Sequence, residues 1–121
     1  MRVVSGNLRG MKLNTIDGDS TRPTREVVKE ALFSILTIDV LDATFLDLFA
    51  GSGAIGIEAI SRGAESAILI DLNPTCVKVI KENVKKGRIE DCTRIYNTDY
   101  KMALKKLKGE KIDIAYIDPP Y

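Results

Sequence analysis

From residue 44 onward, short apolar runs alternate with segments of helical periodicity, and this alternation constrains the fold more than any other feature. Strands are predicted at residues 44–49, 66–70, 93–96 and 112–117, and helices at residues 54–62, 74–86 and 100–107. Strands and helices that alternate in this way form right-handed crossovers between parallel strands. The chain is therefore predicted to be α/β, with a doubly wound, mostly parallel sheet.

The first part of the chain has a different pattern. Residues 2–5 and 11–13 flank a glycine-bounded turn, which predicts a small β-hairpin arm within residues 1–20. A helix is predicted to start at an N-cap, Thr24, and to end at Leu36. Its predicted apolar face consists of Val27, Val28, Ala31, Leu32, Ile35 and Leu36. A chain of 121 residues has room for one core, so residues 21–121 are assigned to a single α/β core.

Acidic residues lie at or near the end of every predicted strand of the core, at Asp47, Asp71, Asp99 and Asp118. In open parallel sheets, ligands bind outside the carboxyl ends of the strands, so these acids are predicted to border a binding site. The strand at residues 112–117 is apolar enough to need neighbours on both sides. We therefore expect the natural chain to continue beyond Tyr121.

A glycine-rich segment, Gly51-Ser52-Gly53-Ala54-Ile55-Gly56, fits the pattern G-x-G-x-x-G between a predicted strand and a predicted helix. Asp71 follows Gly51 by twenty positions, where an acid can accept hydrogen bonds from ribose hydroxyls. In this context the pattern indicates a nucleotide site. The alternative is a tight strand-to-helix turn with no ligand.

Asp47, four residues before Gly51, indicates which type of nucleotide the predicted site would bind. A carboxylate there would repel the pyrophosphate of NAD and attract the ammonium and sulfonium charges of S-adenosylmethionine. The alternative role for Asp47 is to cap the glycine turn. Asp99 is placed either to accept from an adenine amine or to cap the helix that follows it.

The ending Asp118-Pro119-Pro120-Tyr121 follows a predicted buried strand, where prolines are poor continuations because they lack an N–H donor. The Asp118 carboxylate and the Pro119 carbonyl could accept both hydrogens of an exocyclic base amine and orient its lone pair. Tyr121 could then stack on the base, which must be unpaired or flipped out of its stack. The alternative is a rigid loop.

Composition excludes several classes of protein. The chain has no histidine, so Ser-His-Asp and Cys-His catalysis and histidine-based zinc sites are excluded, and we predict no metal site. Cys76 and Cys92 lack a metal-binding spacing, and the sequence shows neither a signal peptide nor a run of the ~18 apolar residues that span a bilayer. We therefore predict a cytoplasmic protein with no membrane contact.

Positive charge is concentrated in two regions. Residues 78–111 hold 11 basic and 5 acidic residues, at spacings that favour solvated helix faces over a phosphate-binding surface. The N-terminal region is the better candidate for nucleic-acid contact, because its basic residues lie in predicted strand and turn sequence. These residues are Arg2, Arg9, Lys12, Arg22 and Arg25.

The sequence also resembles a known family. Residues 47–53 (DLFAGSG) and 118–121 (DPPY) are similar to motifs I and IV of class I S-adenosylmethionine-dependent amino-methyltransferases. Four more segments narrow this resemblance, namely RVVSG (2–6), GMKL (10–13), RPT (22–24) and KEALF (29–33). Together they resemble the RsmD family, bacterial enzymes that methylate the N2 amine of a guanine in 16S ribosomal RNA.

The resemblance implies a Rossmann-like class I methyltransferase sheet, S-adenosyl-L-methionine as the cofactor, and 16S rRNA or the assembling small ribosomal subunit as the partner. The implied cofactor-binding residues are Asp47, Phe49, Gly51, Ser52, Gly53, Asp71, Leu72 and Asp99, with Arg22 and Thr24 over the cofactor. The implied catalytic residues are Asp118, Pro119, Pro120 and Tyr121, and the implied RNA-binding residues are Arg2, Arg9 and Lys12. Two departures are the absence of the family's further strands and an aspartate at position 71, where glutamate is common.

Three alternatives stay open. An adenine-N6 nucleic-acid methyltransferase uses the same DPPY chemistry. An NAD-dependent oxidoreductase uses the same glycine loop, although Asp47 and the DPPY ending argue against it. A catalytically idle nucleic-acid-binding module would keep RNA binding without methyl transfer.

Overall fold

A computed structural model describes residues 1–16 and 23–119. Its elements follow the predicted alternation. In chain order they are α1 (Pro23–Ile35), β1 (Thr44–Asp47), α2 (Ala54–Ser61), β2 (Ser66–Asp71), α3 (Pro74–Gly87), the 3₁₀ helix η1 (Glu90–Cys92), β3 (Thr93–Asn97), α4 (Tyr100–Lys106) and β4 (Ile114–Tyr116). None of the helices in the described ranges is long and apolar enough to cross a membrane.

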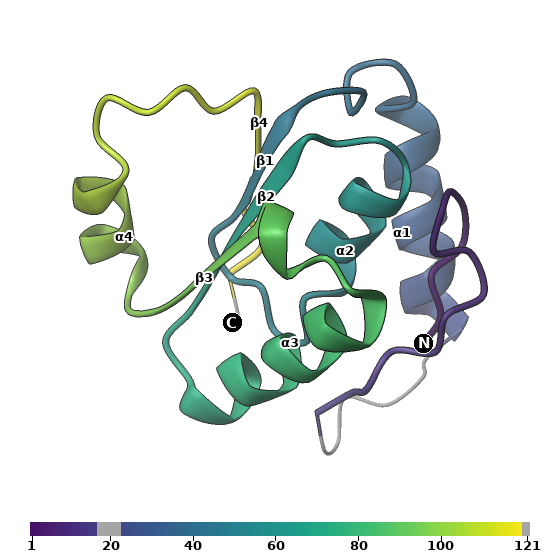
Figure 1. The fold of residues 1–121 in the computed structure, drawn as a ribbon, viewed down its shortest axis with the longest axis horizontal. Coiled ribbons are helices and arrows are strands. Elements are labelled where there is room, and N and C mark those ends of the chain that lie inside the picture. Colours follow the sequence, from purple (N-terminus) through teal and green to yellow (C-terminus); the bar gives the residue numbers. More distant parts are fainter. Residues whose placement is uncertain (17–22, 120–121) are drawn as a thin grey trace.

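The four strands form one parallel sheet in the order β3-β2-β1-β4. Figure 1 shows α1, α2 and α3 on one side of this sheet and α4 on the other. Alternate residues of a strand face opposite sides, so Phe45 packs with Phe33 of α1 while Leu46 packs with Ala103 of α4. The predicted doubly wound parallel sheet is confirmed.

The predicted apolar face of α1 is wrong in most of its positions. The side chains of Val27, Val28 and Ile35 are 64%, 56% and 80% exposed. The buried positions are instead Lys29 and Phe33, which are 1% and 0% exposed. On this face Phe33 packs against Phe45, and Lys29 forms an ion pair with Glu58 of α2 at 3.0 Å. Apolar periodicity does not reveal an ion-pair partner on another helix.

The start of α1 also differs from the prediction. The helix begins at Pro23, so Thr24 lies inside it and is not its N-cap. Proline suits the first helical position because its missing N–H would have no partner there.

The N-terminal arm pairs with itself in antiparallel fashion, and within residues 1–16 a single bridge forms, between Arg2 and Lys12. The Val3 N–H donates to the Met11 carbonyl at 2.9 Å, and Val3 and Leu13 are buried in the core cluster shared with α2 and α3. Gly6 has φ +90°, and a Cβ there would lie 1.8 Å from the Ser61 carbonyl oxygen. The arm therefore packs directly on α2, and glycine is required where the two backbones meet.

Candidate functional site

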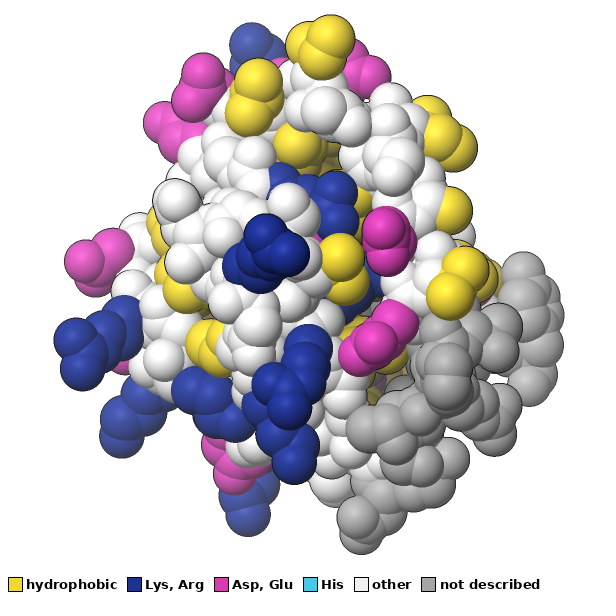
Figure 2. All heavy atoms as spheres, turned by 90° about the vertical axis from the view of Figure 1, so that its right-hand side faces the viewer, with side chains coloured by type: hydrophobic (Ala, Val, Ile, Leu, Met, Phe, Trp, Pro, Cys, Tyr) yellow, Lys and Arg dark blue, Asp and Glu magenta, His cyan; other side chains and the backbone are white. Residues whose placement is uncertain are grey.

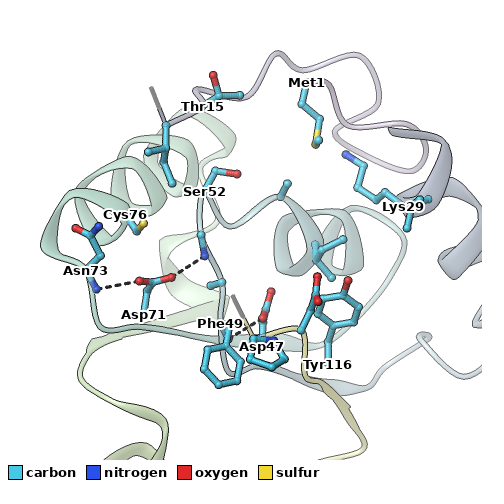
Figure 3. Close-up of a pocket in the computed structure, with 18 residues that line it drawn as sticks. Met1, Thr15, Lys29, Asp47, Phe49, Ser52, Asp71, Asn73, Cys76 and Tyr116 are labelled. Atoms are coloured by element: carbon cyan, nitrogen blue, oxygen red, sulfur yellow. Dashed lines mark hydrogen bonds between the residues drawn. The ribbon is translucent and has the colours of Figure 1, made fainter. Parts of the chain in front are cut away.

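A cavity of about 690 Å³ opens at the carboxyl ends of β1, β2 and β4. The sheet contributes Asp47, Asp71 and Asp118 to its wall. Figure 3 shows Asp47, Phe49 and Asp71 on the lower side of this pocket and Met1 and Thr15 of the arm on the upper side. The acids predicted from the strand ends of β1, β2 and β4 are thus brought together, and the arm covers them.

The glycine loop between β1 and α2 forms one wall of the pocket. Gly51 and Gly53 have φ of +59° and +85°, values that residues with a Cβ rarely adopt. At Gly56 a Cβ would lie 2.2 Å from Cδ2 of Leu69, a fully buried residue of β2. The first two glycines therefore make the turn, and the third lets α2 approach the sheet. Gly51 and Ser52 line the cavity, whereas Gly53 does not.

Asp71 fixes this loop from the neighbouring strand. Its Oδ2 accepts a hydrogen bond from the Gly51 N–H at 2.8 Å, and its Oδ1 accepts one from the Asn73 N–H at 2.9 Å. Each carboxylate oxygen has a second lone pair. Asp71 can therefore hold the loop and still accept hydrogen bonds from a ligand in the pocket.

Asp47 is the most electrostatically unusual residue of the pocket. It is 1% exposed, and its Oδ1 accepts a hydrogen bond from the Phe49 N–H at 3.1 Å. Burial raises the pKa of Asp47 to about 7, and the charges of Asp71 and Asp118 raise it further against the opposing effect of the Phe49 N–H. Among the side chains that the structure describes, those of residues 1–16 and 26–119, no cation forms an ion pair with Asp47. This pocket favours a ligand that carries positive charge.

The chain reaches the pocket again after β4. Asp118 and Pro119 line the cavity, next to Tyr116 of the strand. Pro120 and Tyr121, predicted to act with them, lie outside the described residues, as do Arg22 and the side chain of Thr24.

Besides Gly53, two further predicted cofactor contacts, Leu72 and Asp99, do not line the cavity. The side chain of Leu72 is 68% exposed. Asp99 is exposed and caps α4, because its Oδ1 accepts a hydrogen bond from the Met102 N–H at 2.8 Å. The capping role considered for Asp99 is therefore present, and an adenine contact by this residue stays a prediction.

The predicted RNA-binding residues Arg2, Arg9 and Lys12 are all exposed on the arm. Figure 2 shows the side of the molecule that carries the arm and α1, and Lys and Arg side chains gather on the lower left of this view. Arg2 also donates from Nη1 to the Gly10 carbonyl at 3.1 Å, which helps to close the arm.

Lys29, Glu58 and Asn83 are buried polar residues that the sequence interpretation missed as parts of the site or its support. Asn83 lies on a helix face whose other buried members, such as Val79, Ile80 and Val84, are apolar, and this is a signal that could have identified it. Lys29 lines the cavity, and its Nζ donates to the Arg2 carbonyl at 2.7 Å in addition to pairing with Glu58. Met1, Thr15 and Ile16 were also missed as lining residues, because only the folded arm brings them to the pocket.

Glu58 of α2 contacts both the arm and α1. Its carboxylate accepts hydrogen bonds from the Val4 and Ser5 N–H groups at 3.0 and 3.1 Å. It also pairs with Lys29 at 3.0 Å and with Arg62 Nε at 2.8 Å. Burial acts to raise the pKa of Glu58, but the Val4 N–H, Arg62 and Lys29 together lower it. Both oxygens of this carboxylate are thus bonded to groups of the protein itself.

Comparison with known proteins gives consistent matches. The profile of a family described as Conserved hypothetical protein 95 matches residues 1–121. Ribosomal RNA small subunit methyltransferase D of Buchnera aphidicola is 38% identical over 98% of this chain and 62% of its own length. The protein of the same name from Escherichia coli is 36% identical over 100% of this chain and 60% of its own length.

Among solved structures, one described as "Putative methyltransferase yhhF from Escherichia coli" superimposes with a TM-score of 0.87 and 37% identity. The match covers 100% of this chain and 65% of that one. The chain thus spans somewhat less than two thirds of the length of these three proteins.

Proposed function

Because this chain belongs to the family described as Conserved hypothetical protein 95, the RsmD family, we propose that it holds the cofactor-binding part of an S-adenosylmethionine-dependent rRNA methyltransferase. The proposed acceptor is the exocyclic N2 amine of a guanine in 16S rRNA. The relatives' names support ribosomal RNA of the small subunit as the substrate. The resemblance of the DPPY ending to motif IV supports an amine as the acceptor.

The observation that carries the proposal is Asp47 beside the glycine loop, a buried carboxylate that pairs with no cation among the described side chains. S-adenosylmethionine has a sulfonium and an ammonium group, and a nearby carboxylate stabilises both. The pyrophosphate of NAD would meet Asp47, Asp71 and Asp118 in the same cavity and be repelled. The donor set therefore fits the methyl donor and does not fit the dinucleotide.

The proposed roles follow from where the residues lie. Asp71 accepts hydrogen bonds from the ribose, and Asp47 faces the cationic end of the cofactor. Phe49, Gly51 and Ser52 form the wall against which the cofactor packs. The cofactor supplies the methyl group. The Asp118 carboxylate and the Pro119 carbonyl each accept a hydrogen bond from the base amine. These two bonds localise the lone pair of the amine nitrogen and direct it at the methyl carbon.

The proposed RNA contact is the exposed surface of the arm. Arg2, Arg9 and Lys12 present three cations to solvent there, and the phosphate backbone of RNA is the partner that such a surface attracts. The arm also lines the cavity through Met1, Thr15 and Ile16, so it connects the RNA side of the proposed enzyme with the cofactor.

The first experiment compares thermal unfolding of the protein alone, with S-adenosylhomocysteine, and with NAD. A ligand that binds only the native state raises the unfolding temperature by mass action. We expect a rise with S-adenosylhomocysteine and none with NAD. A rise with NAD alone would overturn the proposal.

The second experiment tests the acceptor chemistry. Asp118→Ala is expected to reduce methyl transfer to rRNA by about a thousandfold, as for loss of a group that acts in the transition state, with unchanged affinity for S-adenosylhomocysteine. The matched control is Asp39→Ala, which removes an exposed carboxylate outside the cavity. Mass spectrometry of the methylated nucleosides distinguishes guanine N2 from adenine N6. An Asp118→Ala enzyme with a wild-type rate would exclude this mechanism.

A further inference from the structure

A single buried amide links the arm to the glycine loop. Asn83 of α3 is 0% exposed and lies among the buried side chains Val79, Ile80 and Val84. Its Oδ1 accepts a hydrogen bond from the Asn14 N–H at 2.7 Å. Its Nδ2 donates to the Asn14 carbonyl at 3.0 Å and to the Ser52 carbonyl at 2.9 Å. Both amide donors and the amide acceptor are therefore used.

The two segments that Asn83 joins both border the cavity. Asn14 precedes Thr15 and Ile16, which line the pocket from the arm, and Ser52 lines it from the glycine loop. Figure 3 shows Thr15 on the upper side of the pocket, with Ser52 below it. Asn83 thus bonds both walls, although it does not itself line the cavity.

A second contact supports the same segment from the surface. Lys86, one helical turn after Asn83, donates from Nζ to the Lys12 carbonyl at 2.8 Å and to Asn14 Oδ1 at 3.0 Å. Because Lys86 is exposed, water can replace these two bonds. Water has no such access to Asn83, so the buried amide is the stronger of the two links.

We propose that Asn83 is a positioning residue for the nucleoside cofactor, because its amide holds the arm at Asn14 and the glycine loop at Ser52 in the spacing that the cofactor needs. The identity of the ligand rests on the function proposed above, and the geometric link does not. Without the amide, the segment at Asn14 would lose its link to the glycine loop while the rest of the arm stays anchored through Glu58 and Ser61. Each cofactor molecule that binds would then have to order this segment against the loop again. Binding would become weaker by that free energy.

The test is the affinity of Asn83→Ala for S-adenosylhomocysteine, measured by calorimetry. We expect about a tenfold weaker affinity, the change that corresponds to the loss of one buried hydrogen bond. The matched control is Ser61→Ala. Ser61 also anchors the arm, since its Oγ accepts from the Leu8 N–H at 2.9 Å and donates to the Ser5 carbonyl at 2.6 Å, but it lies outside the cavity.

The control separates positioning from general stability. Both variants are expected to unfold at a lower temperature, but only Asn83→Ala is expected to lose affinity. Hydrogen exchange of the amides of Asn14, Thr15 and Ile16 is expected to speed up in Asn83→Ala and not in Ser61→Ala. Wild-type affinity in a folded Asn83→Ala protein would overturn the proposal, as would an equal loss of affinity in both variants.

A second variant covers the case in which Asn83→Ala does not fold. Asn83→Leu keeps a similar side-chain volume among Val79, Ile80 and Val84 and buries no charge, but it can bond neither Asn14 nor the Ser52 carbonyl. It is expected to weaken S-adenosylhomocysteine binding as well, and unchanged affinity would overturn the proposal. If the wild-type protein itself did not bind S-adenosylhomocysteine, the proposed function would fail, while the exchange rates at Asn14 and Thr15 would still test the link.

Discussion

Asp47 and Glu58 are two carboxylates with almost the same burial, 1% and 0% exposed, in opposite electrostatic situations. Glu58, at the junction of α1, α2 and the arm, is met by Lys29, Arg62 and two backbone N–H groups. Its pKa is lowered despite burial. Asp47, at the carboxyl edge of the sheet, is met by one N–H group and two further carboxylates, and its pKa rises to about 7.

The difference distinguishes a structural region from a binding region. A buried charge is tolerated only when it is paired and hydrogen-bonded. Glu58 meets this condition within the protein and therefore stabilises the fold. Asp47 does not, and the free protein bears a cost that a cationic ligand can remove. The following predictions test this distinction, beginning with the largest effect.

Replacing the paired carboxylate should destabilise the protein most. Glu58→Gln leaves the buried ammonium of Lys29 without a counter-charge, and this is expected to lower the free energy of unfolding by roughly 3 to 5 kcal/mol. Urea denaturation measures the change. The matched control, Glu65→Gln, alters an exposed glutamate and should leave the midpoint unchanged. A Glu58→Gln protein as stable as the wild type would show that the junction does not depend on the ion pair.

Replacing the unpaired carboxylate should have the opposite effect on stability. Asp47→Asn is expected to raise the free energy of unfolding by roughly 1 to 3 kcal/mol near neutral pH and to weaken S-adenosylmethionine binding. The amide oxygen can still accept from the Phe49 N–H, and no charge is buried. Denaturation and calorimetry on the same samples measure both changes. If Asp47→Asn lost stability, the contrast with Glu58 would be wrong.

The sign of the pH dependence follows from the shifted pKa. The pKa of Asp47 is about 7 in the folded protein, against the ordinary value of 3.8 expected for the unfolded chain. The stability due to its neutral form is therefore complete below pH 3.8 and is lost as the pH rises to about 7. The stability advantage of Asp47→Asn should therefore be small near pH 4 and largest above about pH 7. A constant difference across this range would contradict the shift.

Ligand affinity should depend on pH in the same range. A cationic cofactor binds the ionised form of Asp47, so the affinity for S-adenosylmethionine is expected to increase about tenfold between roughly pH 6 and pH 8. Calorimetric titrations at several pH values measure this, with Asp47→Asn as the control that should show a flat profile. An affinity that falls as pH rises would place the cationic group away from Asp47.

The smallest effect is expected where a carboxylate is paired but exposed. Glu110 forms an ion pair with Arg94 Nη1 at 2.6 Å, and this hydrogen-bonded partner lowers the pKa of Glu110. Solvent and salt screen such a pair. Glu110→Gln should therefore leave the unfolding temperature unchanged within error at physiological salt. A large loss of stability would show that an exposed ion pair can stabilise this protein as much as a buried one.

The sequence predicted the sheet and most of its binding edge. Alternating patterns located the strands, and the acid after each strand located Asp47, Asp71 and Asp118, because residues that end parallel strands meet at one edge. The inward face of α1 was predicted wrongly. Apolar periodicity placed Val27, Val28 and Ile35 inside, whereas the buried cation Lys29 and Phe33 occupy that face.

Local sequence patterns and contacts between distant residues differ in how far the sequence reveals them. The alternation of strands and helices, the glycine turn and the acid at each strand end follow from patterns over a few neighbouring residues, so the sequence determined them by itself. The strand order β3-β2-β1-β4 came from the tertiary structure. The partners of Lys29, Glu58 and Asn83 lie on other elements, and Asn83 meets Asn14 from 69 positions away. Only the tertiary structure decided which buried carboxylate is neutralised and which is left for a ligand, because the energy of a buried charge depends on groups that folding brings to it.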